Sequence, residues 1–153
     1  MDLKYNILWV EDNEDWVISI EDSIQEIVKE YGFVFSKKLI SGKKEGIDYN
    51  GYDLILMDFN LSNTTGDTII KDIRNFDVLT DVVFYSEHKS NILKNKVMEN
   101  NLEGVYYANR EKTQFLDKVK RIIQCTIKKV QDLNNLRGLV MAEVSELDSR
   151  WIQ

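Results

Sequence analysis

The sequence predicts an α/β fold in which a doubly wound parallel sheet carries helices on both faces. Short apolar segments alternate with segments whose apolar residues recur at helical spacing, without a compositional break until about residue 110. Two of the apolar segments, 5–10 and 52–57, are typical of strands buried on both faces, as parallel strands are. Right-handed crossovers then bring the carboxyl ends of all strands to one edge of the sheet.

Length and composition fit one globular domain. The chain has 153 residues, of which 43% are hydrophobic and 30% charged, enough to bury a substantial core. The net charge of -6 argues against direct nucleic-acid binding, which needs a basic surface. A single cysteine, Cys125, excludes an internal disulfide and a cysteine-ligated zinc site. No apolar run approaches about 18 residues and no secretory segment starts the chain, so we expect a cytoplasmic protein without a membrane contact.

The first half of the chain supplies two strands and one full helix. The first strand, 5–10, leads into a helix that Asn13 can cap and that Gly32 ends. The second strand covers 33–40. The connection over 41–50 contains two glycines and is too short for a full crossover helix, so we expect at most one or two turns there.

The rest of the predicted sheet repeats the alternation. We expect further strands at 53–57, 81–86 and 104–107, and helices that contain 69–76 and 92–98.

From residue 111 the pattern changes to one long helical stripe. A helix over 111–135 would be about 37 Å long at 1.5 Å per residue, longer than one sheet edge, so its distal apolar residues need another partner. Gly138 should interrupt the helix. Beyond it, apolar residues resume at helical spacing at Val140, Val144, Leu147 and Trp151.

The domain prediction is therefore a globular domain over 1–125 and a helical extension over 126–153. The extension either folds back as a helical hairpin, pairs with a second copy of the chain, or leads into a downstream effector. We favour a homodimer, because a two-fold pair buries both stripes at once.

Carboxylates follow two of the predicted strands directly. Glu11 and Asp12 follow the first strand, and Asp58 ends the third. Because the carboxyl ends of parallel strands share one edge, the three side chains should lie together. Like charges this close either raise one another's pKa or hold a cation, and oxygen ligands of this number suit Mg²⁺. The sequence therefore predicts an acidic Mg²⁺ pocket in which Asp58 can also act as an acceptor.

In this order the residues resemble the receiver domain of two-component response regulators. The resemblance rests on Glu11-Asp12, on Asp58-Phe59-Asn60-Leu61 with Gly66 eight residues beyond Asp58, and on Ser86 at the end of the fourth strand. It covers roughly residues 4–125. It implies a flavodoxin-like (βα)₅ sheet of order 2-1-3-4-5 and a signalling switch rather than an enzyme. A histidine kinase or phosphotransfer protein would supply the phosphoryl group.

The resemblance also implies a role for each site residue. Asp58 would be the phosphoacceptor and, with Asp12, a direct Mg²⁺ ligand; Glu11 would act through water and Asn60 through its backbone carbonyl. Ser86 would supply the hydroxyl that moves toward the phosphoryl group, with an aromatic ring of the last strand turning inward behind it. The cation is needed because carboxylate attack on a phosphoryl group brings two anions together.

The chain departs from the family pattern at its lysine-proline pair, where Ala108 and Asn109 stand instead. Arg110, or else Lys112, is the candidate substitute, although arginine is a planar fork rather than a point charge. Ser62 replaces the proline that follows the phosphoacceptor motif, which should loosen that loop.

The aromatic switch is ambiguous in sequence. Direct alignment puts Val105 at its place, while Tyr106 and Tyr107 are one and two residues away, and strand alternation sends these two to opposite faces. Tyr106, the aromatic residue nearest to that place, is the candidate for the switch.

Two other functions stay open. A pseudo-receiver would keep the fold as an interaction module without a phosphorylation cycle, and would not respond to Mg²⁺ with beryllofluoride. A haloacid-dehalogenase-like phosphatase also uses an aspartate on such a sheet. It needs a second aspartate two residues later, and Asn60 stands there, which removes a general acid worth roughly 10²–10⁴-fold.

Overall fold

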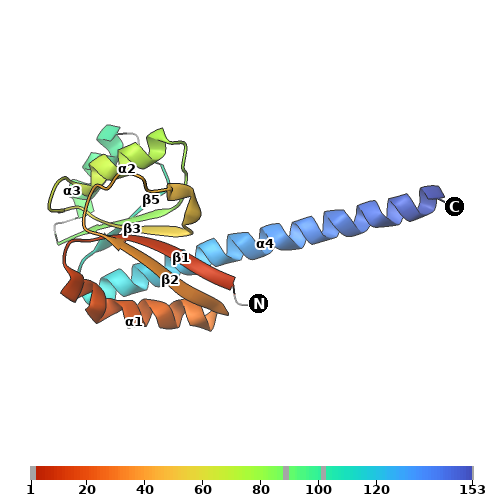
Figure 1. The fold of residues 1–153 in the computed structure, drawn as a ribbon. Helices are drawn as coiled ribbons and strands as arrows, with labels where there is room; N and C mark the ends of the chain where they lie inside the picture. Colours follow the sequence, from red (N-terminus) through yellow and green to blue (C-terminus); the bar gives the residue numbers. More distant parts are fainter. Residues whose placement is uncertain (1–2, 88–89, 101–102, 153) are drawn as a thin grey trace. The chain divides into compact units, whose positions relative to one another are not determined.

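Five parallel strands form one sheet in the order β2-β1-β3-β4-β5 in the computed structural model, which describes residues 3–87, 90–100 and 103–152 (Figure 1). Every strand predicted from the sequence is present, and the flavodoxin-like strand order is confirmed. The strands are β1 (Leu3–Val10), β2 (Phe33–Ile40), β3 (Leu54–Asp58), β4 (Val82–Ser86) and β5 (Val105–Asn109).

The helices follow the predicted alternation as well. They are α1 (Glu14–Glu30), the single 3-10 turn η1 (Tyr49–Gly51), α2 (Gly66–Asn75), α3 (Ser90–Asn100) and α4 (Lys112–Ile152). Asn13 caps α1, since its side chain accepts a hydrogen bond from the Trp16 amide, and Gly32 follows it with φ of +82°. As expected, only one turn, η1, replaces a crossover helix between β2 and β3.

Two apolar layers hold the helices against the sheet. α2 and α3 cover one face, where Ile69 and Leu93 join a buried cluster with sheet residues such as Phe84 (Figure 1). α1 covers the other face and buries Val17, Ile20, Ile24 and Val28 fully, each worth about 1.5–3 kcal/mol. Ring contacts of Phe115 with Trp9 and Trp16 place the first turn of α4 on the α1 side.

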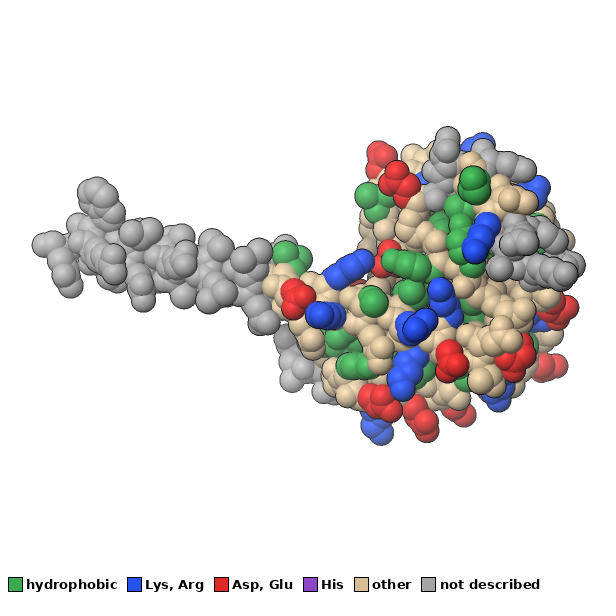
Figure 2. Space-filling model, turned by 180° about the vertical axis from the view of Figure 1, so that it is seen from behind, with side chains coloured by type: hydrophobic (Ala, Val, Ile, Leu, Met, Phe, Trp, Pro, Cys, Tyr) green, Lys and Arg blue, Asp and Glu red, His purple; other side chains and the backbone are tan. Residues whose placement is uncertain are grey.

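The molecular surface mixes side chains of every kind. Figure 2 shows the face turned away in Figure 1, where hydrophobic, basic and acidic side chains all lie exposed. Scattered exposed apolar residues are usual on globular proteins and need no partner to explain them. Over the described residues, no helix is both long enough and apolar enough to span a bilayer.

One prediction for the C-terminal region is wrong. α4 runs without a break through Gly138, so the expected interruption and the helical hairpin do not form. A single glycine costs about 1 kcal/mol relative to alanine, which good helix formers on both sides outweigh. The chain divides into two compact units, Met1–Ile123 and Gln124–Gln153.

The expectation that the distal apolar residues of α4 need another partner is wrong for Ile127 and stays a prediction for the residues beyond it. Ile127 is buried, whereas Leu133 is 48% exposed. The side chains beyond Leu133, including Val140, Val144, Leu147 and Trp151, lie outside the described residues, so their partner stays a prediction.

Gly66 is required by close packing beneath β3. A Cβ atom there would overlap the Asp58 carbonyl oxygen and press on the side chains of Met57 and Phe84. We predict that Gly66→Ala lowers the free energy of unfolding by about 1–3 kcal/mol in urea denaturation, as overpacking does. Gly51→Ala is the matched control, because nothing lies within 4 Å of its added Cβ. Equal stability of the two variants would contradict this reading.

Candidate acidic metal centre

The three predicted carboxylates meet at the carboxyl edge of the sheet. Glu11 and Asp12 lie in the β1–α1 loop and Asp58 ends β3, and one carboxylate oxygen of each lies within 4.8 Å of the others. Glu11 is 1% exposed and Asp58 4%, while Asp12 is open to solvent. The sequence prediction that these side chains come together is confirmed.

Backbone hydrogen bonds of the sheet fix where the strands end. The Glu11 amide donates to the Ile40 carbonyl at 2.9 Å, and the Phe59 amide donates to the Tyr85 carbonyl at 3.0 Å. The Asn13 amide donates to Glu11 Oε2 at 3.1 Å, so the cap of α1 also orients Glu11. The acidic cluster is therefore held by the ends of the regular elements rather than by a free loop.

The loop after Asp58 folds back on itself. Asn60 forms an antiparallel bridge with Thr65, and the Gly66 amide donates to the Phe59 carbonyl at 2.8 Å. Asn63 adds a tie to the β2–β3 connection: its Oδ1 accepts from the Lys43 amide at 3.1 Å and its Nδ2 donates to the Lys43 carbonyl at 3.3 Å. These contacts restrain the loop in which Ser62 replaces the family's proline.

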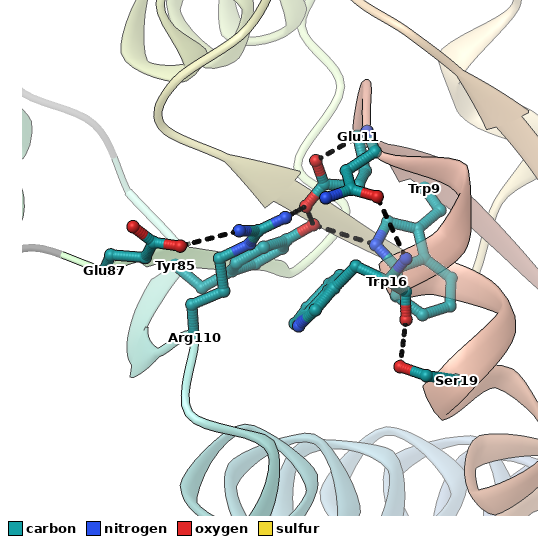
Figure 3. Close-up of polar contacts among 8 residues, drawn as sticks. Trp9, Glu11, Trp16, Ser19, Tyr85, Glu87 and Arg110 are labelled. Carbon is teal, nitrogen blue, oxygen red and sulfur yellow. Dashed lines mark hydrogen bonds and ion pairs between the residues drawn. The ribbon is translucent and has the colours of Figure 1, made fainter.

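Arg110 enters the pocket at the end of β5. Its Nη2 donates to Glu11 Oε1 at 3.1 Å and its Nη1 to Glu87 Oε1 at 2.9 Å (Figure 3). A pocket of about 220 Å³ lies beside it, lined by Asp12, Asn13, Asp58, Asn60, Glu87 and Arg110. Ala108, at the family's lysine position, is instead buried. Among the described residues, Arg110 is thus a cation that lies beside Asp58.

Burial and like charge set the acidity of the site. Burial, followed by the charge of Glu11 and a hydrogen bond with it, raises the pKa of Asp58 to about 8, while Arg110 and the Asn60 amide oppose this. Burial lowers the pKa of Arg110, but attraction to Glu11, a hydrogen bond with Glu87 and attraction to Asp58 together outweigh it, so the net pKa is raised. The cluster carries more negative charge than its neighbours offset, which favours a bound cation.

Two consecutive buried hydrogen bonds, from Trp9 to Tyr85 and from Tyr85 to Glu11, hold the Glu11 carboxylate in place. Trp9 Nε1 donates to the Tyr85 hydroxyl at 2.9 Å, and that hydroxyl donates to Glu11 Oε1 at 3.1 Å (Figure 3). Burial, then the charges of Glu11 and Asp58, raise the pKa of Tyr85 well above its usual value, so it stays a donor. Sequence reasoning missed Tyr85, because an aromatic residue in a buried strand gives no sign of a polar role.

Ser86 and the tyrosines of β5 divide between the two faces of the sheet. Ser86 is fully buried, and its carbonyl accepts from the Arg110 amide at 3.0 Å. Tyr107 packs against the α2–α3 cluster, with Lys94 Nζ 5.7 Å from its ring centre. Strand alternation puts Ser86 on that face too and Tyr106 on the other. Tyr107, rather than the favoured Tyr106, therefore shares the face of Ser86.

The donor set fits Mg²⁺. Six oxygens at about 2.1 Å place opposite ligands about 4.2 Å apart, close to the spread of the three carboxylates. Asp12 and Asp58 have the shorter side chains and would coordinate directly. Glu11 Oε1 already accepts from Tyr85 and Arg110, which suits a ligand that acts through water.

Comparison with known proteins decides the family. The sequence matches the family described as "Response regulator receiver domain" over residues 7–120. The chain belongs to the response regulator receiver domain family. No curated protein sequence matches at a significant level. The match extends from β1 into α4, so the receiver fold and the acidic edge belong to one module.

Solved receiver structures share the fold at low sequence identity. The phosphorylated cyanobacterial phytochrome response regulator RcpA is 18% identical with a TM-score of 0.63, over 82% of this chain and 96% of that one. A two-component response regulator from Clostridium difficile is 19% identical with a TM-score of 0.62, over 83% of this chain and 98% of that one. A response regulator receiver domain from Methylobacillus flagellatus is 22% identical with a TM-score of 0.58, over 80% of this chain and 98% of that one.

Metal binding should relieve the charge repulsion in this receiver. We predict that Mg²⁺ raises the unfolding temperature, with about 2.7 kcal/mol gained at 100 times the dissociation constant. Asp12→Ala should remove most of that gain. In EDTA at a pH above 8, where the folded protein holds Asp58 as a buried charge, Asp58→Asn should itself raise the unfolding temperature, since it removes that charge.

Asp53→Asn is the matched control, because Asp53 lies exposed just before β3, at the opposite end of the strand from Asp58. Differential scanning calorimetry measures all four proteins. If Mg²⁺ stabilises Asp12→Ala as much as wild type, the metal is bound elsewhere.

Proposed function

We propose that this receiver is phosphorylated on Asp58 in a Mg²⁺-dependent reaction and that phosphorylation switches a protein-interaction face. The observation that supports it is the meeting of Asp58, Asp12 and Arg110 in one pocket at the carboxyl edge of the sheet, with Glu11 within reach of both aspartates and bonded to Arg110. A buried carboxylate beside a metal-binding pair and a cation is what phosphoryl transfer between two anions requires.

The transfer itself is a displacement at phosphorus. An Asp58 carboxylate oxygen forms the new O–P bond while the bond to the donor's nitrogen or oxygen breaks, and the leaving group takes the electron pair. Mg²⁺ would neutralise the phosphoryl oxygens during this step. Asp12, Glu11 and the Asn60 carbonyl would hold it. Arg110 would offset the remaining negative charge in place of the family's lysine.

The signal would leave through β5 and the α2–α3 face. Ser86 lies buried at the end of β4 on the side where Tyr107 packs, next to α3. A hydroxyl that moves toward the phosphoryl group would open space for that ring. Tyr107 is therefore the aromatic switch in this proposal. The donor would be a histidine kinase or phosphotransfer protein in the cytoplasm.

Acetyl phosphate with Mg²⁺ should add one phosphoryl group to the wild-type protein, as an acid-labile gain in mass. Asp58→Asn should abolish the gain, and Asp53→Asn, the exposed carboxylate that precedes the same strand, should leave it unchanged. Arg110→Ala should slow the reaction roughly 10²-fold, the usual cost of losing one charge-stabilising donor. Intact-protein mass spectrometry over time measures each rate.

A pseudo-receiver is the second candidate, and the Arg110 contacts favour it. The guanidinium is already bonded to Glu11 and Glu87, and Ala108 stands where the family has its lysine. If neither acetyl phosphate nor a kinase changes the wild-type mass while Mg²⁺ is bound, the pseudo-receiver replaces our proposal.

We further propose that α4 continues into a parallel two-stranded coiled coil with a second copy of the chain. Beyond Ile127 its sequence follows the alternating three- and four-residue spacing of a heptad seam: Val130, Leu133, Arg137, Val140, Val144, Leu147 and Trp151. Valine at the first core position and leucine at the second favour two strands, and one charged core residue sets the register. Such a helix can instead lead to an effector, and the test below separates the two.

Removing residues 134–153 should convert a dimer into a monomer in sedimentation while leaving phosphorylation intact. Val144→Glu with Leu147→Glu should do the same, because both side chains belong to the seam. Ala142→Glu with Ser149→Glu, outside the seam on the same helix, should remain dimeric. A monomer before and after truncation would contradict the dimer.

A further inference from the structure

We propose that Trp16 is a positioning residue for Arg110, holding the guanidinium where it can meet the phosphoryl group. The proposal rests on the proposed function and assigns a role to a residue of α1 that the receiver pattern does not include. The observation behind it is the guanidinium carbon of Arg110, which lies 4.6 Å from the centre of the Trp16 ring (Figure 3).

Arg110 needs such support because of where it starts. It follows β5 by one residue, beyond the buried Ala108 at the family's lysine position, so its side chain must be turned back toward Asp58. Two carboxylates compete for it: Glu11, which is buried beside Asp58, and Glu87, whose side chain is 74% exposed. Without a support, the exposed carboxylate would be free to draw the guanidinium out toward solvent.

The ring of Trp16 gives the Arg110 guanidinium a fixed surface to pack on, which opposes its movement toward Glu87. Its backbone amide is bonded to the Asn13 cap at 3.1 Å, which sets its place in the first turn of α1. Its ring stacks on Tyr85 at 5.2 Å with 25° between the planes, and meets Phe115 at 5.1 Å. Tyr85 and Phe115 are both fully buried. The ring therefore stays in place when the guanidinium moves.

The contact with Trp16 leaves the Arg110 guanidinium able to bind a phosphoryl oxygen. Aromatic faces attract a guanidinium without using its N–H groups, so its donors remain free for oxygen ligands. Only two N–H bonds of Arg110 to carboxylates are recorded, and its buried Nε has no hydrogen-bond partner in the part of the chain that the structure describes. The aromatic contact lets Arg110 exchange Glu87 for a phosphoryl oxygen while keeping its position.

The same ring contributes to the core, so its packing role must be separated from its positioning role. Ile24→Ala provides the control, because Ile24 is a fully buried residue of the same helix, and its truncation removes core packing two turns beyond Trp16 rather than beside its ring. Trp16→Phe keeps an aromatic face, whereas Trp16→Leu keeps only apolar volume.

The test is the rate of Asp58 phosphorylation by acetyl phosphate at saturating Mg²⁺. Trp16→Leu should slow it roughly 5- to 30-fold, equivalent to about 1–2 kcal/mol at 1.36 kcal/mol per factor of ten. Trp16→Phe should recover most of the rate, and Ile24→Ala should stay close to wild type. In an Arg110→Ala background, Trp16→Leu should have no further effect, because the two residues act as one unit. Circular dichroism and Mg²⁺-dependent stabilisation confirm that each variant folds.

The outcomes separate a failure of the proposed function from a failure of the role assigned to Trp16. If the wild type is not phosphorylated, the proposed function and this inference fall together. If the wild type reacts but Trp16→Leu matches it, or if Ile24→Ala is equally slow, only the inference is overturned. An undiminished effect of Trp16→Leu without Arg110 would overturn it as well.

Discussion

Repulsion among three carboxylates at one sheet edge is the constraint on which the rest of the site depends. The parallel sheet brings Glu11, Asp12 and Asp58 within 4.8 Å of one another, and two of them are buried. Such a cluster persists only if positive charge and hydrogen-bond donors offset it. The surrounding residues supply these: Arg110 contributes the charge, and the Tyr85 hydroxyl and the Asn13 amide contribute the donors.

An arginine beside the acidic cluster shapes the neighbourhood of the pocket. A lysine would end in a compact point charge, whereas the guanidinium is planar and presents several donors and a stacking face. Arg110 uses both features, with two carboxylate partners and an aromatic surface beneath it. The aromatic group of Trp9, Trp16, Tyr85 and Phe115 therefore links the acidic edge to the packing between α1 and the start of α4.

Much of the fold could be read from the sequence, because periodicity and the order of the elements carry it. Strand ends differ by at most two residues from expectation, and the acidic cluster follows from the topology alone. The features that the sequence did not predict correctly depend on contacts with residues elsewhere in the fold or along the helix. Gly138 does not stop α4, because the good helix formers on both sides stabilise the helix by more than one glycine destabilises it. Trp16 and Tyr85 gave no signal, since their roles arise from neighbours distant in sequence.

The most direct test is fluorine NMR of beryllofluoride, which mimics the phosphoryl group on aspartate. With Mg²⁺ present, bound fluorine signals should appear for the wild type and vanish on addition of EDTA or in Asp58→Asn. Signals that persist in Asp58→Asn, or that never appear for the wild type with Mg²⁺ bound, would contradict a working phosphoacceptor pocket.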